Sequence, residues 1–156
     1  MTLFPPAVTI QHWSSAIGLF IINFGALDYL LLSLLQSHLA SAEFALIRNR
    51  HFKDRIARLR ALVQADSFSS EQKQAFEEFF RSLEPVRELR NHIAHGYILC
   101  RVSDDGKTHA LTISMPADLD SPGNGAPIQL SHEAVQTALS QLTGLIESLR
   151  HLAPRE

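Results

Sequence analysis

The N-terminal part of the chain holds its longest apolar run. From about Val8 to Leu39 there is no proline, and residues 16–35 are almost continuously apolar. An apolar helix of about 20 residues is long enough to cross a bilayer. However, Asn23 and Asp28 interrupt the run, and an aspartate in the middle of a bilayer is costly. No lysine or arginine precedes Arg48, so the basic anchors of a membrane span are missing. We therefore expect a helix buried in a bundle or a dimer, with a membrane helix as the alternative.

The next apolar pattern predicts a single helix from Ser41 to about Gln64. Its stripe recurs at spacings of 4, 3 and 4 residues, in Phe52, Ile56, Leu59 and Val63. Such spacings place apolar side chains on one face of a helix. We therefore expect this face to pack against the bundle.

The polar positions of this second helix form the only strongly basic stretch of the chain. Its cations outnumber Glu43 and Asp54, and they are Arg48, Arg50, Lys53, Arg55, Arg58 and Arg60. One interpretation is a solvated helix face. The other is a track of phosphate contacts that leads RNA to a site, made by Arg48, Arg50, Arg55 and Arg58. Aromatic residues for base stacking are sparse there, so base-specific recognition is not implied.

A third helix is predicted to begin near Ser69, because Gln72 three positions later completes a pattern that resembles a capping box. Its apolar positions continue through Phe76, Phe79, Phe80 and Leu83. Pro85 lacks a backbone donor and clashes with the preceding turn, so it should kink or restart the helix. A further segment should then end at Gly96, a natural helix stop.

The pattern changes to alternation after Gly96. Residues 97–102 and 108–115 alternate like strands around a turn sequence, which predicts a β-hairpin over about 97–115. Residues 116–130 are rich in Pro, Gly, Asp and Asn and should form a flexible loop. Ser131 can cap a last helix, whose apolar positions alternate by 3 and 4 residues. These elements predict an all-α fold: an up-and-down four-helix bundle with a β-hairpin inserted before the last helix, in a single domain of residues 1–156.

Composition and charge narrow the class of protein. The chain has 156 residues, of which 46% are hydrophobic and 19% charged, as in a folded globular domain. The net charge of −2 does not suggest bulk nucleic-acid binding, so any basic surface must be local. The single cysteine, Cys100, excludes an internal disulfide and a multi-cysteine zinc site. A reducing, cytoplasmic setting is the simplest interpretation.

The richest chemistry lies at the predicted end of the third helix, in residues 88–97, which read ELRNHIAHGY. Histidine can transfer a proton near neutral pH, and the arginine fork fits a phosphate. Arg90, Asn91 and His95 therefore suit attack of a ribose 2′-hydroxyl on the adjacent phosphodiester, with a histidine base and an arginine that stabilises the phosphorane. On a straight helix, Arg90 and His95 point about 140° apart. A helix end, the length of arginine or a second copy of the chain would have to bring them together.

These residues also resemble the R-x(4–6)-H motif of the HEPN superfamily, in the form Arg90-Asn91-x-x-x-His95-Gly96. HEPN proteins are small helical bundles, generally dimeric, and many are metal-independent endoribonucleases of toxin–antitoxin, CRISPR and phage-defence systems. The resemblance implies a homodimeric endoribonuclease that acts on RNA without a cofactor. Its products would carry a 2′,3′-cyclic phosphate and a 5′-hydroxyl. The alternative is a non-catalytic HEPN module that binds RNA, nucleotide or a protein partner.

Two further residues enter through the resemblance. Tyr97 completes the R-x(4)-H-x-Y form of a toxin subgroup, whose partner is a nucleotidyltransferase that can modify the tyrosine; a packing role is the alternative. Residues 24–28 resemble the first-helix pattern F-G-x-L-E, with Asp28 in the acidic place. We interpret Asp28 as the partner of a buried arginine, for which Arg90 is a candidate. His92 and His95 share a helix face, but a third metal ligand at a recognisable spacing is missing, so no metal site is predicted.

Overall fold

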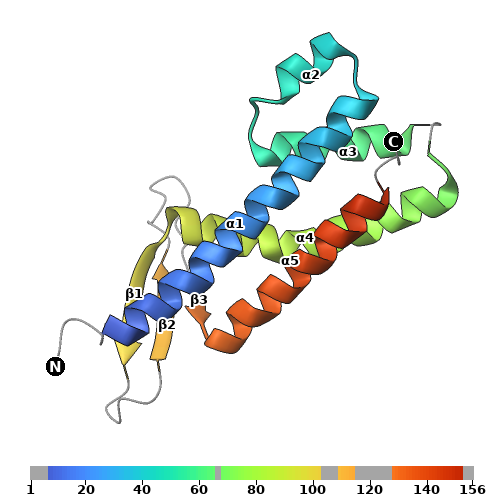
Figure 1. The fold of residues 1–156 in the computed structure, drawn as a ribbon. Helices are drawn as coiled ribbons and strands as arrows, with labels where there is room; N and C mark the ends of the chain where they lie inside the picture. Colours follow the sequence, from blue (N-terminus) through green and yellow to red (C-terminus); the bar gives the residue numbers. More distant parts are fainter. Residues whose placement is uncertain (1–6, 66–67, 103–108, 115–127, 153–156) are drawn as a thin grey trace. The chain divides into compact units, whose positions relative to one another are not determined.

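The computed structural model describes residues 7–65, 68–102, 109–114 and 128–152. This part of the chain is mostly helical, in agreement with the expected all-α class, and includes one small antiparallel sheet (Figure 1). The elements in chain order are α1 (Ala7–His38), α2 (Ser41–Ile47), α3 (Phe52–Gln64), α4 (Ser70–His95), β1 (Tyr97–Val102), β2 (His109–Ser114), β3 (Ile128–Leu130) and α5 (His132–Leu152).

The chain divides into two compact units, which are described separately. Unit 1 comprises Met1–Ile22 and Pro85–Gln141, and unit 2 comprises Asn23–Glu84 and Leu142–Glu156. The three long helices α1, α4 and α5 each contribute residues to both units. Neither unit is therefore a continuous piece of the sequence.

Unit 2 has an aromatic core where α4 begins. Phe76 stacks on Phe80 with ring centroids 6.1 Å apart, and Phe68 meets the edge of Phe76 at 5.7 Å. His38, the last residue of α1, stacks on Phe68 at 5.3 Å. All three phenylalanines are buried. Burying one such side chain contributes about 1.5–3 kcal/mol, so this cluster is a main source of stability in unit 2.

The single helix that we predicted over residues 41–64 is wrong. Two helices, α2 and α3, occupy this range, and residues 48–51 between them form a turn. His51 has an extended backbone, with φ −60° and ψ 152°, which cannot continue a helix. Of the predicted apolar stripe, Ile56, Leu59 and Val63 of α3 are buried and Phe52 is half-buried. All seven residues of α2, each within the described part of the chain, are half-buried or exposed.

The start of α4 confirms the capping box. The Ser69 backbone N–H donates to Gln72 Oε1 at 2.9 Å, and the Gln72 N–H donates to Ser69 Oγ at 3.2 Å. The helix then runs through Pro85 to His95, so a restart at the proline is wrong. Leu83 and Val86, on either side of Pro85, are both buried, and their burial favours a continuous helix despite the one backbone hydrogen bond that proline removes.

Unit 1 contains the sheet, whose strand order is β1-β2-β3. β1 and β2 pair antiparallel, from Tyr97 opposite Ser114 to Val102 opposite His109. β3 pairs with β2, so the predicted loop over 116–130 is wrong for residues 128–130. The rest of that loop, and the turn of the hairpin, lie outside the described residues. Leu130 is buried and Gln129 is exposed, an alternation too short to be recognised from the sequence.

The cap of α5 is as predicted. The Ala134 N–H donates to Ser131 Oγ at 3.1 Å, which satisfies one donor of the first turn. Beyond it, the apolar stripe of α5 is buried at Val135, Ala138, Leu142, Leu145 and Leu149. This stripe supplies core residues to both units, since the division between them falls after Gln141.

Candidate functional site

The motif residues occupy the last two turns of α4, in unit 1. The Gly96 backbone N–H donates to the His92 carbonyl at 2.7 Å and closes the final turn, and β1 begins at the next residue. The predicted helix end at Gly96 therefore agrees with the observed end of α4 at His95. The side chain of Tyr97 lies outside the described part of the chain.

Arg90 and Asn91 lie together. Arg90 Nη1 donates to Asn91 Oδ1 at 3.4 Å, a long hydrogen bond, and both side chains are half-buried. The amide oxygen is thus a hydrogen-bond acceptor for the guanidinium. His95, one turn further on, is exposed to solvent. A solvent-exposed imidazole and a guanidinium therefore lie at the same helix end, on different faces of the helix.

His92 is held by its own helix. Its Nδ1 lies 2.8 Å from the carbonyl oxygen of Glu88, one turn earlier. Sequence reasoning considered His92 only as a metal ligand together with His95. Among the described residues, no group of three His, Cys, Asp or Glu side chains could hold a metal ion. The spacing of four between Glu88 and His92 was the available signal for this hydrogen bond.

The predicted basic track in unit 2 divides into two kinds of residue. Arg48 and Arg50 are exposed at the turn between α2 and α3. Arg55 instead forms an ion pair with Asp28 of α1, with 2.7 Å between Nη2 and Oδ2. Arg58 forms an ion pair with Glu43 of α2. The side chain of Arg55 is only 12% exposed, so its place in the structure is that of an internal cation and not of a free phosphate ligand.

Arg55 also donates a hydrogen bond to the end of α2. Its Nη1 donates to the carbonyl oxygen of Arg48 at 3.1 Å. The guanidinium of Arg55, a residue of α3, thus contacts both the Asp28 carboxylate on α1 and the Arg48 carbonyl at the end of α2. The interpretation of Asp28 as the partner of a buried arginine therefore agrees with the structure, and that arginine is Arg55. A pairing of Asp28 with Arg90, which belongs to the other unit, stays a prediction.

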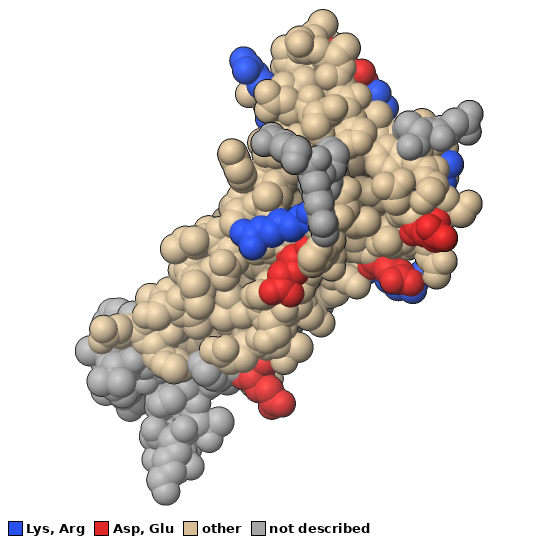
Figure 2. All heavy atoms as spheres, turned by 45° about the vertical axis from the view of Figure 1, so that its right-hand side comes forward, with Lys and Arg blue, Asp and Glu red and all other residues tan. Residues whose placement is uncertain are grey.

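The basic residues do not gather into one surface on the face seen in Figure 2. Among the described residues drawn there, Lys and Arg side chains are scattered, and several of them lie beside Asp or Glu side chains. Arg60 covers the ring of Phe80, with its guanidinium carbon 4.8 Å from the ring centroid. Such a cation–π contact stabilises the packed state of Arg60. The exposed cations that remain near the α2–α3 turn are Arg48, Arg50 and Lys53.

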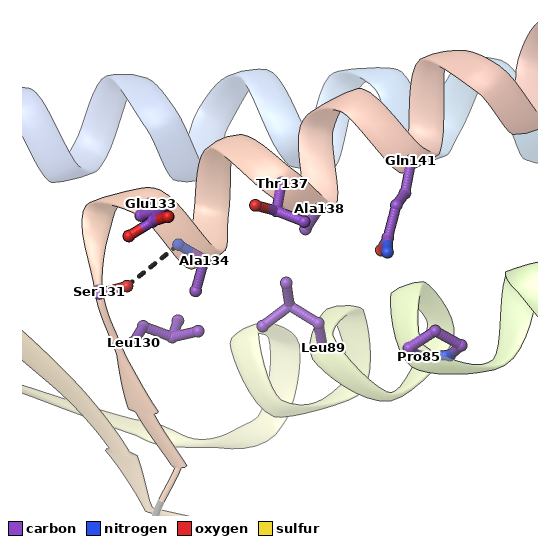
Figure 3. Close-up of a pocket in the computed structure, with 9 residues that line it drawn as sticks. All are labelled: Pro85, Leu89, Leu130, Ser131, Glu133, Ala134, Thr137, Ala138 and Gln141. Carbon is purple, nitrogen blue, oxygen red and sulfur yellow. Dashed lines mark hydrogen bonds between the residues drawn. The ribbon is translucent and has the colours of Figure 1, made fainter.

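A hollow of about 400 Å³ lies within unit 1, beside the motif-bearing part of α4 (Figure 3). Leu89 points from α4 toward α5, and Ala134 and Ala138 of α5 point toward α4. Its polar lining residues are Ser131, Glu133, Thr137 and Gln141. The lining is mostly apolar and contains one ionisable side chain. The hollow therefore suits packing of an apolar group more than acid–base chemistry.

Comparisons of the chain with protein-family models, with curated proteins and with solved structures gave no match.

Proposed function

We propose that the protein is a HEPN-like, metal-independent endoribonuclease that acts as a homodimer on RNA. The observation that carries the proposal is the end of α4, where Asn91 contacts Arg90 and an exposed His95 follows within the last turn. The same residues make up the R-x(4)-H motif, and the mostly helical chain is consistent with a HEPN bundle that carries an inserted hairpin. The chemistry of the three side chains is sufficient for transesterification of RNA.

In the proposed reaction, His95 takes the proton from a ribose 2′-hydroxyl. The hydroxyl oxygen attacks the adjacent phosphorus, and the bond to the 5′-oxygen of the next nucleotide breaks. Arg90 stabilises the additional negative charge on the phosphorane, a contribution that is large where donors are already oriented. Asn91 keeps the guanidinium in place through its amide oxygen. The products carry a 2′,3′-cyclic phosphate and a 5′-hydroxyl.

An exposed apolar stripe on α1 supports the homodimer. In unit 1, Leu19 and Ile22 are 51% and 70% exposed, and their spacing of 3 places them on one side of the helix. Tyr29, in unit 2, is also 70% exposed. Only 28% of the most apolar window of α1 is buried, whereas a core helix would be mostly buried. Exposed apolar patches of this kind mark interfaces. By length and composition α1 could also cross a membrane, so the test of assembly must include that outcome.

The proposed dimer would also bring an Arg90 and a His95 side chain to the same phosphate. Arg90 and His95 diverge by about 140° around α4. Two copies of α4 that meet near a two-fold axis would place Arg90 of one copy and His95 of the other around one phosphate. Arg48 and Arg50 are exposed at the α2–α3 turn of unit 2, where they are available for phosphate contacts with RNA.

The resemblance also supports a biological setting. We propose a cytoplasmic toxin or effector of a toxin–antitoxin or phage-defence system. Tyr97 would be the residue that a nucleotidyltransferase-type antitoxin modifies. A strand residue directly after the catalytic helix end is close enough in sequence for its modification to block RNA.

Cleavage of RNA by the purified protein tests the proposal. His95→Ala should reduce the rate by about 10²–10⁴, as loss of a general base typically does. Arg90→Lys should also fail, because a point charge does not reproduce the two-pronged contact of arginine. A chelator should have no effect. His151→Ala is the matched control, because His151 is an exposed histidine in the last turn of another helix, α5.

Three results would contradict the mechanism: cleavage that persists in His95→Ala, cleavage that requires a divalent metal, or an equal loss in the control. Melting temperatures of all variants must be measured on the same samples, so that unfolding is not mistaken for loss of catalysis. Wild-type protein that binds RNA but cleaves none would instead favour the non-catalytic binding module.

A further inference from the structure

His92 has a defined tautomer. Its Nδ1 lies 2.8 Å from the carbonyl oxygen of Glu88, and a carbonyl oxygen can only accept a hydrogen bond. The hydrogen is therefore on Nδ1. Nε2 is then the nitrogen that gains or loses a proton, and the bond to Glu88 holds the ring in one orientation. His92 is half-buried, so part of the residue is open to solvent.

His92 is close to the proposed base. His92 and His95 are three positions apart on α4, and such pairs have Cβ atoms about 5–6 Å apart on one helix face. His92 is tied to the helix, whereas His95 in the final turn is exposed. The two histidines therefore belong to one helix face at the place of the proposed reaction, and the structure gives a hydrogen bond that holds the His92 ring.

The proposed reaction needs two proton transfers. A base removes the proton of the 2′-hydroxyl, and an acid protonates the 5′-oxygen as its bond to phosphorus breaks. His95 can perform one of these transfers in a given turnover, and arginine stays charged at neutral pH. The second transfer requires another group within reach of the same phosphate.

We propose that His92 is the general acid of this reaction and delivers the proton from Nε2 to the leaving 5′-oxygen. The inference rests on the proposed ribonuclease function and deepens it. The bond from the 2′-oxygen to phosphorus forms while the bond from phosphorus to the 5′-oxygen breaks. The proton of the 2′-hydroxyl passes to His95, and His92 ends neutral. Exchange with water restores both histidines.

A purely structural role predicts the same hydrogen bond, because histidine near a helix C-terminus often bonds the last carbonyls. His38 does so at the end of α1, where its Nδ1 lies 3.0 Å from the carbonyl oxygen of Leu34. The test must therefore separate proton transfer from helix capping. His92→Asn does this, since its side-chain amide can still donate to the Glu88 carbonyl but cannot transfer a proton.

The experiment compares two RNA substrates of identical sequence. One has the natural 5′-oxygen at the cleaved bond, and the other has sulfur in its place. A thiolate leaves without an acid, because thiols such as cysteine ionise at about pH 8.5. We expect the His92→Asn variant to cleave natural RNA about 10²–10⁴-fold more slowly than wild type. The same variant should cleave the sulfur-containing RNA at close to the wild-type rate. His95→Ala should be slow on both substrates.

The controls separate failure of this inference from failure of the proposed function. His38→Asn alters the equivalent bond at the end of α1 and should leave both rates unchanged. If wild type cleaves natural RNA and His92→Asn does so equally well, His92 is not the acid, and the ribonuclease proposal stands. If His92→Asn is equally slow on both substrates, the inference is overturned as well. If wild type cleaves neither substrate, both proposals fail.

Discussion

The ion pair between Arg55 and Asp28 should stabilise unit 2, and replacement of Arg55 measures by how much. Arg55→Ala would remove the contact of 2.7 Å to the carboxylate and the bond of 3.1 Å to the Arg48 carbonyl. It would also leave the Asp28 carboxylate, which is 26% exposed, with less compensation for its burial. The change therefore acts on the fold before it acts on any RNA contact.

The expected loss of unfolding free energy in Arg55→Ala follows from the exposure of the Arg55 and Asp28 side chains. Exposed ion pairs contribute about 0–1 kcal/mol, while breaking a fully buried pair costs about 3–5 kcal/mol. Arg55 and Asp28 are 12% and 26% exposed, closer to the buried case. We expect Arg55→Ala to lower the free energy of unfolding by about 2–3 kcal/mol, between these limits. Asp28→Asn should cost less, because an amide oxygen can still accept from the guanidinium.

Urea denaturation followed by far-UV circular dichroism measures the change, since a lower midpoint at constant slope reports lost stability. Lys53→Ala is the matched control: Lys53 is an exposed cation on the same helix, and the change should stay within about 0.5 kcal/mol. A variant that combines Arg55→Ala with Asp28→Asn should show a coupling energy of about 0.5–3 kcal/mol between the two positions. An Arg55→Ala variant as stable as Lys53→Ala would refute the reasoning and return Arg55 to the proposed RNA surface.

Three further predictions concern other parts of the chain. Ser69→Ala should lower the free energy of unfolding by about 1 kcal/mol, because it removes one half of the capping box of α4; an unchanged urea midpoint would contradict this. Replacing Arg48 and Arg50 with glutamine should reduce the slope of log affinity for single-stranded RNA against log salt by about 1.4, with stability unchanged, and an unaltered slope would assign both residues to solvation alone. Ile22→Lys combined with Tyr29→Ser should convert the dimer to a monomer in light scattering, whereas a wild-type monomer at micromolar concentration, or extraction only with detergent, would argue against the α1 interface.

Several features were determined by the amino-acid sequence alone, and each depends on contacts within a few residues. The capping box of Ser69 and Gln72 formed as expected, because its two bonds join groups three positions apart. The Ser131 cap formed for the same reason. The extent of α1, Ala7–His38, followed from a helical pattern that no proline interrupts. The helix end at Gly96 needed no tertiary contact either. For the candidate site, this local information placed Arg90, Asn91 and His95 at one helix end.

Tertiary structure decided which partner each polar side chain takes. Arg48 and Arg55 belong to the same basic stretch of the sequence. The guanidinium of Arg55, however, contacts a carboxylate 27 positions away. The break between α2 and α3 was equally hidden, since the apolar stripe begins only after it, at Phe52, and carries no information on residues 48–51. β3 is too short to show a period and exists through its pairing with β2. The exposure of Ile22 and Tyr29 likewise could not be read from an almost uniformly apolar segment. Helical periodicity identifies the faces of a helix, but only the positions of the neighbouring elements decide which apolar face is covered and which charge is neutralised.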